Sequence, residues 1–208
     1  MPYRSTDKTR QKKETKRTAM MQAAVRIFAD KGYQAATVRD IVNAADVAIG
    51  TFYFYFPDKE TLFLHLYEET GDFVLHTVQQ GLNSRMTYPR QVQAAVQAYV
   101  NIAVFEPAIV QLLLVGGVGA LPSLTEKQAA FREKLIQMWQ RLISDALDRD
   151  VILPQNDRRT AEGVAGAIDE VVLNLISQPD SEAQANGAVQ DLTAFILRAT
   201  GYYGKAAG

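Results

Sequence analysis

TVRDIVNAADVAIGTFYFYFPDK, residues 37–59, is the stretch that decides the fold of this chain. Thr37 and Asp40 form a capping-box pattern, and the apolar residues after them recur at helical spacing, which predicts a helix of about two turns. Asp46 falls in a tight turn, because Asp tolerates the left-handed backbone conformation better than most residues. A second short helix is predicted from Ile49 to Phe56. Two short helices around a tight turn are typical of a helix-turn-helix, whose second helix enters the major groove of DNA.

The second of these helices is dense in aromatic residues. Phe52 and Phe56 lie four residues apart, so both are expected to point into a small core. A core cannot absorb aromatic side chains around the whole circumference of a helix. Tyr53 and Tyr55 are therefore expected to offer their hydroxyl groups to DNA phosphates. Gly50 would let the helix backbone approach the floor of a groove closely.

The residues that follow the second helix predict its end and the start of a third. Pro57 stops the short helix, and Asp58 caps the next one. Lys59 adds positive charge at a helix N-terminus that already suits a phosphate group. The whole segment is thus interpreted as a DNA-reading helix flanked by phosphate-binding groups.

The segment FADKGYQAATVRDIVNAADVAIGTFYFYFPDKETLF, residues 28–63, resembles the DNA-binding domain of the tetracycline-repressor (TetR) family of bacterial regulators. The resemblance is dense over residues 15–67 and only architectural beyond them. The usual glycine of the turn, the serine before the reading helix and a frequent histidine within it are replaced here by Asp46, Ala48 and Tyr55.

The resemblance implies base-edge and groove contacts at Ile49, Gly50 and Thr51. It also implies phosphate contacts from Tyr53, Tyr55 and Lys59, and a backbone contact at Thr37. With the basic N-terminal segment and the outer face of the reading helix, the predicted DNA-contacting residues are Arg10, Lys16, Arg17, Thr37, Ile49, Gly50, Thr51, Tyr53, Phe54, Tyr55 and Lys59.

The charge of the chain is unevenly distributed. The net charge of −1 divides into +4 over residues 1–60 and −5 over the remainder. The first 17 residues hold seven basic groups against two acidic ones. Such a segment is often only a solubilising tail, but ahead of a helix-turn-helix it favours a phosphate or minor-groove arm. Residues 1–14 are predicted to form a disordered basic arm.

The composition narrows the possible functions. The chain has no cysteine, and its two histidines, His65 and His76, have no third ligand at metal spacing, so no metal site or cofactor is expected. No nucleophile or acid/base set stands at useful spacing, which argues against an enzyme. No signal peptide is visible, and the apolar stretch 108–121 is too short to cross a bilayer, so a cytoplasmic protein without membrane contact is expected.

The rest of the chain predicts an all-α fold of about nine helices. We expect a helix-turn-helix domain over residues 15–57, a helical ligand-binding and dimerisation domain over residues 58–200, and a frayed tail over residues 201–208. Residues 116–122, GGVGALP, suggest a glycine-rich phosphate cradle, but no strand precedes them and no lysine stands where that motif needs one.

The last two predicted helices, near residues 158–178 and 183–200, are rich in small residues that allow close helix packing. Packing within one chain is one interpretation. The other is a two-fold four-helix contact between protomers, because a single helix-turn-helix has little affinity and needs a symmetric partner. The family resemblance also implies a homodimer through these helices. The predicted interface residues are Ala161, Ala165, Ile168, Val172, Leu192, Phe195 and Ile196.

A helical domain behind a DNA reader suggests a sensor. The three apolar helices predicted between residues 90 and 148, with part of the helix before them, could surround a cavity. The low charge of the first two favours an apolar small-molecule effector. The candidate lining residues are Tyr67, Tyr99, Phe105, Leu112, Met138, Trp139 and Asn174, although each could equally be plain core. The predicted function is a transcriptional regulator that binds a palindromic double-stranded operator. Repression is the default of the family, and the alternative is a constitutive DNA-binding protein without a ligand.

Overall fold

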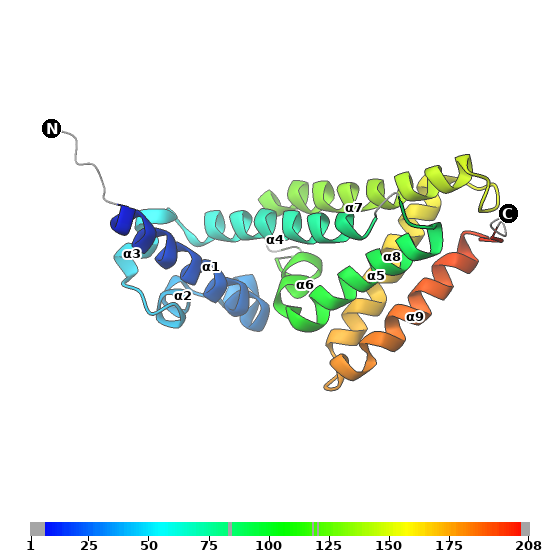
Figure 1. Cartoon of the computed structure of the whole chain (residues 1–208). Coiled ribbons are helices and arrows are strands. Elements are labelled where there is room, and N and C mark those ends of the chain that lie inside the picture. Colours follow the sequence, from blue (N-terminus) through cyan, green and yellow to red (C-terminus); the bar gives the residue numbers. More distant parts are fainter. Residues whose placement is uncertain (1–6, 83–84, 118, 120, 205–208) are drawn as a thin grey trace.

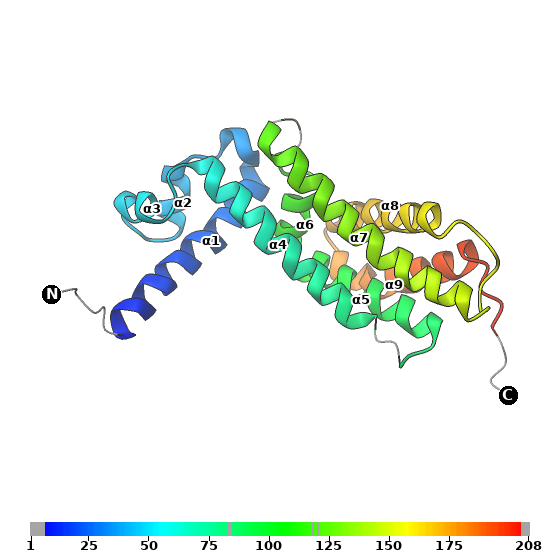
Figure 2. The same ribbon diagram turned by 90° about the horizontal axis from the view of Figure 1, so that it is seen from above.

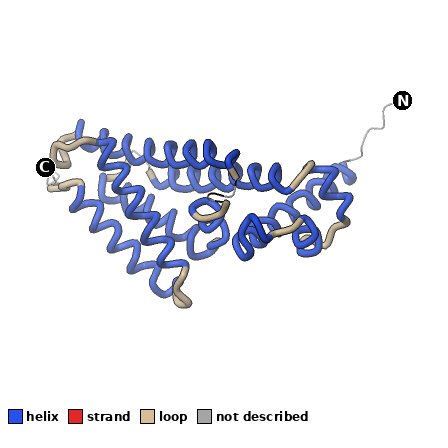
Figure 3. Tube along the Cα trace, turned by 180° about the vertical axis from the view of Figure 1, so that it is seen from behind, coloured by secondary structure: helices blue, strands red, loops and turns tan. Residues whose placement is uncertain are grey.

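The computed structural model describes residues 7–82, 85–117, 119 and 121–204, and the side chains of residues 7–13 lie outside that description. Within these residues every regular element is a helix, and the prediction of an all-α fold is confirmed (Figures 1 and 3). The helices are α1 (Asp7–Ala35), α2 (Val38–Ala44), α3 (Ile49–Tyr55), α4 (Lys59–Gly81), α5 (Tyr88–Phe105), α6 (Pro107–Leu114), α7 (Pro122–Asp148), α8 (Asp157–Ile176) and α9 (Ser181–Ala199).

Helices α1–α3 form the head of the molecule, and α4–α9 form its body. Figures 1 and 2 show the head at one end, with α4 running from it along the body beside α7. Three exposed polar contacts link α4 to α7: Ser123 Oγ donates to Glu60 at 2.5 Å, Lys127 pairs with Glu68, and Lys134 pairs with Asp72 at 3.3 Å. Helix α4 therefore belongs to both parts and joins them.

The helix caps and the tight turn of the head form where the sequence predicts them. The Thr37 hydroxyl accepts the N–H of Asp40 at 3.1 Å, and the Asp40 carboxylate accepts the N–H of Thr37 at 3.0 Å, which completes a capping box. Asp46 has a positive φ of 51° in the turn between α2 and α3. Asp58 caps α4 through the N–H of Thr61 at 2.7 Å. Ala48, before α3, provides no side-chain cap.

Helix α1 begins earlier than predicted. It starts at Asp7, whereas the sequence analysis placed residues 1–14 in a disordered arm, so residues 7–14 are corrected to helix. The remaining arm residues, 1–6, lie outside the described part of the chain. Gly32 interrupts the helix with φ 71° and ψ 165°, a backbone geometry that suits glycine, and the helical run then continues to Ala35.

The end of the chain is held in place up to Gly204. Ile152 and Tyr202 form an isolated antiparallel bridge, and the Tyr203 hydroxyl donates to the carbonyl oxygen of Asp150 at 2.7 Å. The Gln155 amide donates to the carbonyl oxygen of Thr200 at 2.7 Å. The predicted frayed tail is therefore wrong for residues 201–204, and residues 205–208 fall outside the description.

Two helices of the body are apolar along much of their length. No single helix of the described chain has the length and hydropathy to span a bilayer. Helices α5 and α6 pass that test only as a pair, and the chain bends by 103° between them.

Candidate nucleic-acid interface

Helix α3 presents large apolar and aromatic side chains to solvent. Phe52 is fully buried, whereas Ile49, Tyr53 and Phe54 are 47%, 56% and 65% exposed. An added Cβ at Gly50 would meet no atom within 4 Å. Exposure of this kind on a two-turn helix gains nothing for folding, since large apolar side chains stabilise a protein when they are buried. The outer face of α3 is thus shaped for contact with another molecule.

The rings on α3 brace one another. Phe52 contacts Phe56 with ring centroids 5.9 Å apart, and it meets Tyr53 edge to face at 5.3 Å. Phe54 and Tyr55 form a second edge-to-face pair at 4.9 Å. Because Phe52 and Phe56 are buried, they anchor the helix, while their aromatic neighbours carry contact area and hydroxyl groups at its surface.

The start of α2 is electrostatically fixed. Hydrogen bonds from Lys31 and Thr37 lower the pKa of Asp40 to about 2, and Lys31 Nζ lies 2.8 Å from its carboxylate. The Thr37 hydroxyl also donates to Asp40 at 2.8 Å. The N–H and the hydroxyl of Thr37 are thus both engaged within the capping box, at the position where the family resemblance implies a DNA contact.

The predicted cationic contacts fall into three groups. Lys16 is exposed on α1. The side chain of Arg10 lies outside the described part of the chain. Arg17 pairs with Glu69 of α4 at 3.1 Å and contacts the His65 ring, and Lys59 donates hydrogen bonds to backbone carbonyl groups of the head. Two of the predicted phosphate-binding groups are therefore engaged inside the protein.

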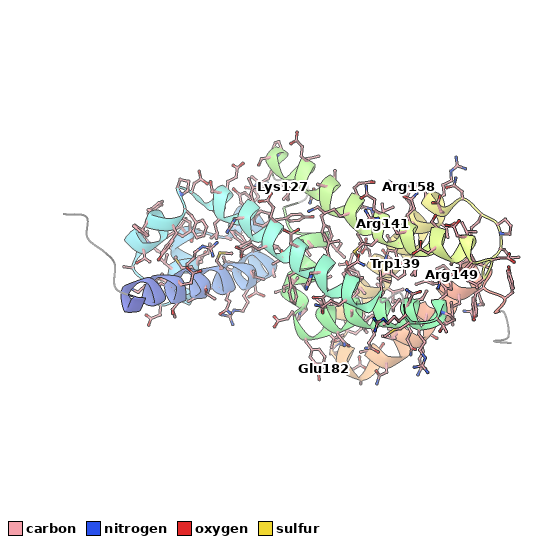
Figure 4. All side chains as sticks on the ribbon, turned by 45° about the horizontal axis from the view of Figure 1, so that its top comes forward. Lys127, Trp139, Arg141, Arg149, Arg158 and Glu182 are labelled. Atoms are coloured by element: carbon pink, nitrogen blue, oxygen red, sulfur yellow. The ribbon has the colours of Figure 1, made fainter. Side chains whose placement is uncertain are left out.

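The structure does not gather the seven predicted effector-lining residues around one cavity. Leu112 and Trp139 (labelled in Figure 4) are buried in the packed body, whereas Phe105 is 67% exposed at the end of α5. The Tyr67 hydroxyl donates to the carbonyl oxygen of Leu113 at 3.1 Å, and Tyr99 donates to Asp169. The two remaining residues also separate: Met138 borders a surface groove between α4 and α7, and Asn174 is exposed on α8.

A buried polar cluster was missed by the sequence analysis. The Asp169 carboxylate accepts hydrogen bonds from the Tyr99 hydroxyl at 3.0 Å and from Arg132 Nη1 at 2.5 Å, which connects α8 to α5 and α7. Burial raises the pKa of Asp169, and it also raises that of Tyr99. One signal was available: Asp169 lies four residues after Ala165 and next to Ile168, on the apolar face of its helix.

Most of the predicted dimer-interface residues lie on the inner faces of α8 and α9. Six of the seven residues are at most 3% exposed within a single protomer; they are Ala161, Ala165, Ile168, Val172, Leu192 and Ile196. Of the seven, Leu192 and Phe195 border the outer groove between α8 and α9. Only Phe195 is exposed. Ala161 and Ala165 pack inside the protomer, whereas Ala167, Gly187 and Ala188 line a groove on the outer surface.

A groove of about 780 Å³ follows the outer surface between α8 and α9. Its apolar lining comes from Val171 and Leu175 of α8 and from Ala188 and Phe195 of α9, while Glu170, Asn174 and Asp191 are among its polar lining residues. Val171 and Phe195 count among the large exposed apolar side chains. This groove offers an apolar surface of α8 and α9 to another protein.

The described residues contain no group of three or more His, Asp or Glu side chains that could hold a metal ion. The glycine-rich loop after α6 has a packing role at Gly117. This residue has a φ of 73°, and an added Cβ would lie 2.9 Å from Leu124 and 3.0 Å from Phe63. Close packing against two side chains therefore accounts for this glycine without a phosphate ligand.

Comparison with known proteins identifies both parts of the chain. Residues 20–66 match the profile for bacterial regulatory proteins of the tetR family, and residues 90–198 match the tetracyclin repressor-like C-terminal domain. The regulator BetI of Rhizobium meliloti is 26% identical over 190 residues, which cover 89% of this chain and 91% of the relative. The repressor KstR2 of Rhodococcus jostii is 32% identical over 90 residues, or 41% of this chain and 44% of the relative.

Several relatives match only through one segment. YuxN of Bacillus subtilis is 32% identical over 81 residues, which cover 37% of this chain and only 28% of that relative. Solved structures share the whole fold. A regulatory protein from Rhodococcus RHA1 has a TM-score of 0.77 at 20% identity, covering 91% of this chain and 98% of that one. FadR of Bacillus subtilis, solved in complex with stearoyl-CoA, has a TM-score of 0.74 at 19% identity, covering 86% and 98%.

Proposed function

The chain belongs to the TetR family of bacterial transcriptional regulators, and from this membership we propose that it binds a two-fold symmetric DNA operator as a homodimer and represses transcription. The family consists of DNA-binding regulators and not of enzymes. The observation that carries the proposal is the open face of α3, where Ile49, Tyr53 and Phe54 are exposed around a glycine with free space above it. A helix inserted into a major groove needs such a face.

The exposed groups of α3 suggest which of its residues contact bases and which contact phosphates. Ile49, Gly50 and Thr51 stand at the start of the helix, and the N-terminal residues of a recognition helix are those that contact base edges. The exposed hydroxyl of Tyr53 suits a phosphate oxygen, which would fix the register of the protein on the duplex. Lys16 adds an exposed positive charge on α1.

We further propose that the groove between α8 and α9 forms the dimer contact. A two-fold axis would place Val171 and Phe195 of one protomer against the same surface of its partner, as an isologous interface requires. The exposed apolar side chains and the volume of the groove, about 780 Å³, support this assignment. Dimerisation matters for function because two heads would then meet two half-sites of one operator.

We also propose that an apolar small molecule releases the protein from DNA. Apolar α5 and α6 supply the walls, and the related fold of FadR was solved with stearoyl-CoA. A second candidate, a constitutive DNA-binding protein, is favoured by one observation: Leu112, Trp139 and Ala103 are buried in a filled core. An effector would have to open this core, so it must stabilise a second arrangement of the body.

The first experiment tests DNA binding. We would footprint the DNA that flanks the gene of this chain and measure the affinity for the protected site by fluorescence anisotropy. The expected result is a protected sequence with two-fold symmetry, bound by two protomers. The Gly50→Leu variant serves as the matched control, because it should fold and bind the operator much more weakly. Protection without symmetry, or equal binding by this variant, would contradict the proposal.

The second experiment decides between the sensor and the constitutive protein. A panel of fatty acyl, aromatic and cationic lipophilic compounds is tested by thermal shift and calorimetry, with and without operator DNA. A true effector weakens operator binding by the same factor by which the operator weakens effector binding. If no compound binds, the sensor is rejected and the constitutive alternative takes its place.

A further inference from the structure

The ammonium group of Lys59 lies inside a ring of backbone oxygens. Nζ donates hydrogen bonds to the carbonyl oxygens of Tyr33 at 2.7 Å and Ala36 at 2.8 Å, with the Gln34 oxygen at 3.5 Å. It also lies 4.3 Å from the centroid of the Tyr33 ring, within the range of a cation–π contact. Lys59 belongs to the first turn of α4, whereas all its partners belong to the end of α1 and the chain just after it.

This arrangement has a clear electrostatic cause. The last carbonyl groups of a helix lack intrahelical partners and carry partial negative charge. Helix α1 has no basic residue in its own last turn, and the backbone at Gly32 departs from helical geometry there. Lys59 supplies the missing cation from another helix. Its partial burial lowers the pKa of Lys59, but the carbonyl dipoles and the tyrosine ring hold the charged ammonium group.

An ion pair also joins the same two helices. Arg17 of α1 lies 3.1 Å from Glu69 of α4, which stands ten residues after Lys59 and hence about 15 Å farther along the helix. Between the two attachments, the Phe63 ring of α4 contacts the rings of Phe28 and Tyr33, with centroid distances of 4.8 Å and 5.1 Å. Two attachments with packed rings between them prevent α4 from pivoting on α1.

We propose that Lys59 and Arg17 are positioning residues that fix α4 to α1 as one rigid frame, and that their side chains are not phosphate ligands of the bound operator. This inference rests on the proposed function. In this proposal the two cations transmit a movement of α4 to the head. Because they prevent α1 from sliding on α4, a displacement of α4 in the body turns the whole head. The phosphate contacts then belong to groups that the structure leaves at the surface, such as Tyr53 and Lys16.

The test compares three variants by the salt dependence of operator affinity and by thermal unfolding. Each phosphate contact that is lost makes the slope of log K against log salt shallower by roughly 0.9. Lys59→Met keeps most of the aliphatic stem and removes the cation. Lys16→Met is the matched control, because Lys16 is an exposed lysine of α1. Lys59→Arg tests rescue, since a guanidinium group can donate to the same carbonyl oxygens.

Lys59→Met should lower the unfolding temperature by roughly 2–4 °C and weaken operator binding about tenfold, with an unchanged salt slope. Lys59→Arg should recover most of both losses. Lys16→Met should leave the unfolding temperature unchanged and make the slope shallower. A shallower slope for Lys59→Met overturns the inference, and so does a Lys59→Met protein with neither a thermal nor a binding defect.

A DNA-free measurement separates failure of this inference from failure of the proposed function. In the NMR spectrum of the free protein, the Cε protons of Lys59 should be shifted upfield by the Tyr33 ring, and Tyr33→Leu should abolish this shift. Absence of the shift in the wild-type protein overturns the inference even if the operator is bound. Its presence supports the inference even if the operator chosen for the salt series proves to be the wrong one.

Discussion

Helix α3 of the head and the core of the body use their aromatic residues in opposite ways. On α3 of the head, Tyr53 and Phe54 face solvent, and only Phe52 is fully buried. In the body, Tyr67, Tyr99 and Trp139 are buried, and the two tyrosine hydroxyl groups are hydrogen-bonded to protein atoms. Helix α3 therefore keeps aromatic side chains exposed as a contact surface, whereas the core of the body buries its large side chains and is stabilised by them. Substitutions should separate these two regimes.

The largest effect is expected at the exposed groove of the body. Phe195→Asp would place an unpaired charge in the proposed dimer contact, which costs several kcal/mol, so sedimentation should show monomers. Phe73→Asp is the matched control, because Phe73 is 48% exposed on α4 and Phe195 is 46% exposed on α9. A Phe195→Asp protein that stays dimeric would place the interface elsewhere.

Glycine substitutions sharpen the contrast between function and stability. Gly50→Leu should weaken operator binding roughly 100-fold by overpacking the groove, while the unfolding temperature is maintained. In the body, Gly81 is its counterpart, because an added Cβ there would lie 2.9 Å from the backbone of Ala94 and Ala95. Gly81→Ala should therefore lower the unfolding temperature in calorimetry. Equal thermal losses in both variants would contradict the distinction between an open and a packed glycine.

A smaller effect is expected from single hydroxyl groups. Tyr53→Phe should remove one phosphate hydrogen bond and weaken operator binding by about 1 kcal/mol, without loss of thermal stability. Tyr99→Phe removes a hydroxyl group from the body, where it would leave the buried Asp169 with one donor fewer. Anisotropy titrations and thermal unfolding of both variants should give opposite patterns. If Tyr53→Phe binds as tightly as the wild type, its hydroxyl group does not contact a phosphate.

The smallest effect concerns pH and the capping box of α2. The pKa of Asp40 is lowered to about 2 in the folded protein, chiefly by hydrogen bonds from Lys31 and Thr37, against about 3.9 in an unfolded chain. The carboxylate therefore stabilises the fold above about pH 4, and this contribution is lost as the pH falls through about 2. The stability difference between the wild type and Asp40→Asn, from urea unfolding, should be constant near neutrality and shrink in acid. A difference that grows in acid would contradict the assignment.

The sequence predicts the head better than the body for a physical reason. Capping at Thr37 and Asp58 and the turn at Asp46 depend on neighbours within a few residues, so their spacing alone defines them. For the faces of α8, residue spacing does not decide what each face packs against. Ile168 and Val172 could equally pack against their own protomer or against a partner, and only the positions of other helices decide between these outcomes.

Charged residues show the same limit within the head. Lys59 follows a helix cap, and the sequence therefore predicts a phosphate-binding cation there. Nothing near it in the sequence indicates that it would bind the carbonyl oxygens of Tyr33 and Ala36. These oxygens lie more than twenty residues earlier in the chain. Arg17 is similar, since its partner Glu69 comes from the middle of α4. Sequence spacing identifies a cation, but tertiary structure determines its partner.

The anchored C-terminal segment has a practical consequence for protein engineering. The Tyr203 hydroxyl donates to the carbonyl oxygen of Asp150, which joins the segment after α9 to the connection between α7 and α8. These segments lie at the end of the body farthest from the head (Figure 1). A fluorescent reporter or an affinity handle joined after residue 204 would sit at the opposite end of the protomer from α3 and spare its reading surface. The same handle at the N-terminus would adjoin the basic start of α1. A C-terminal fusion with a short flexible spacer is therefore the better format for the binding assays and for imaging in living cells.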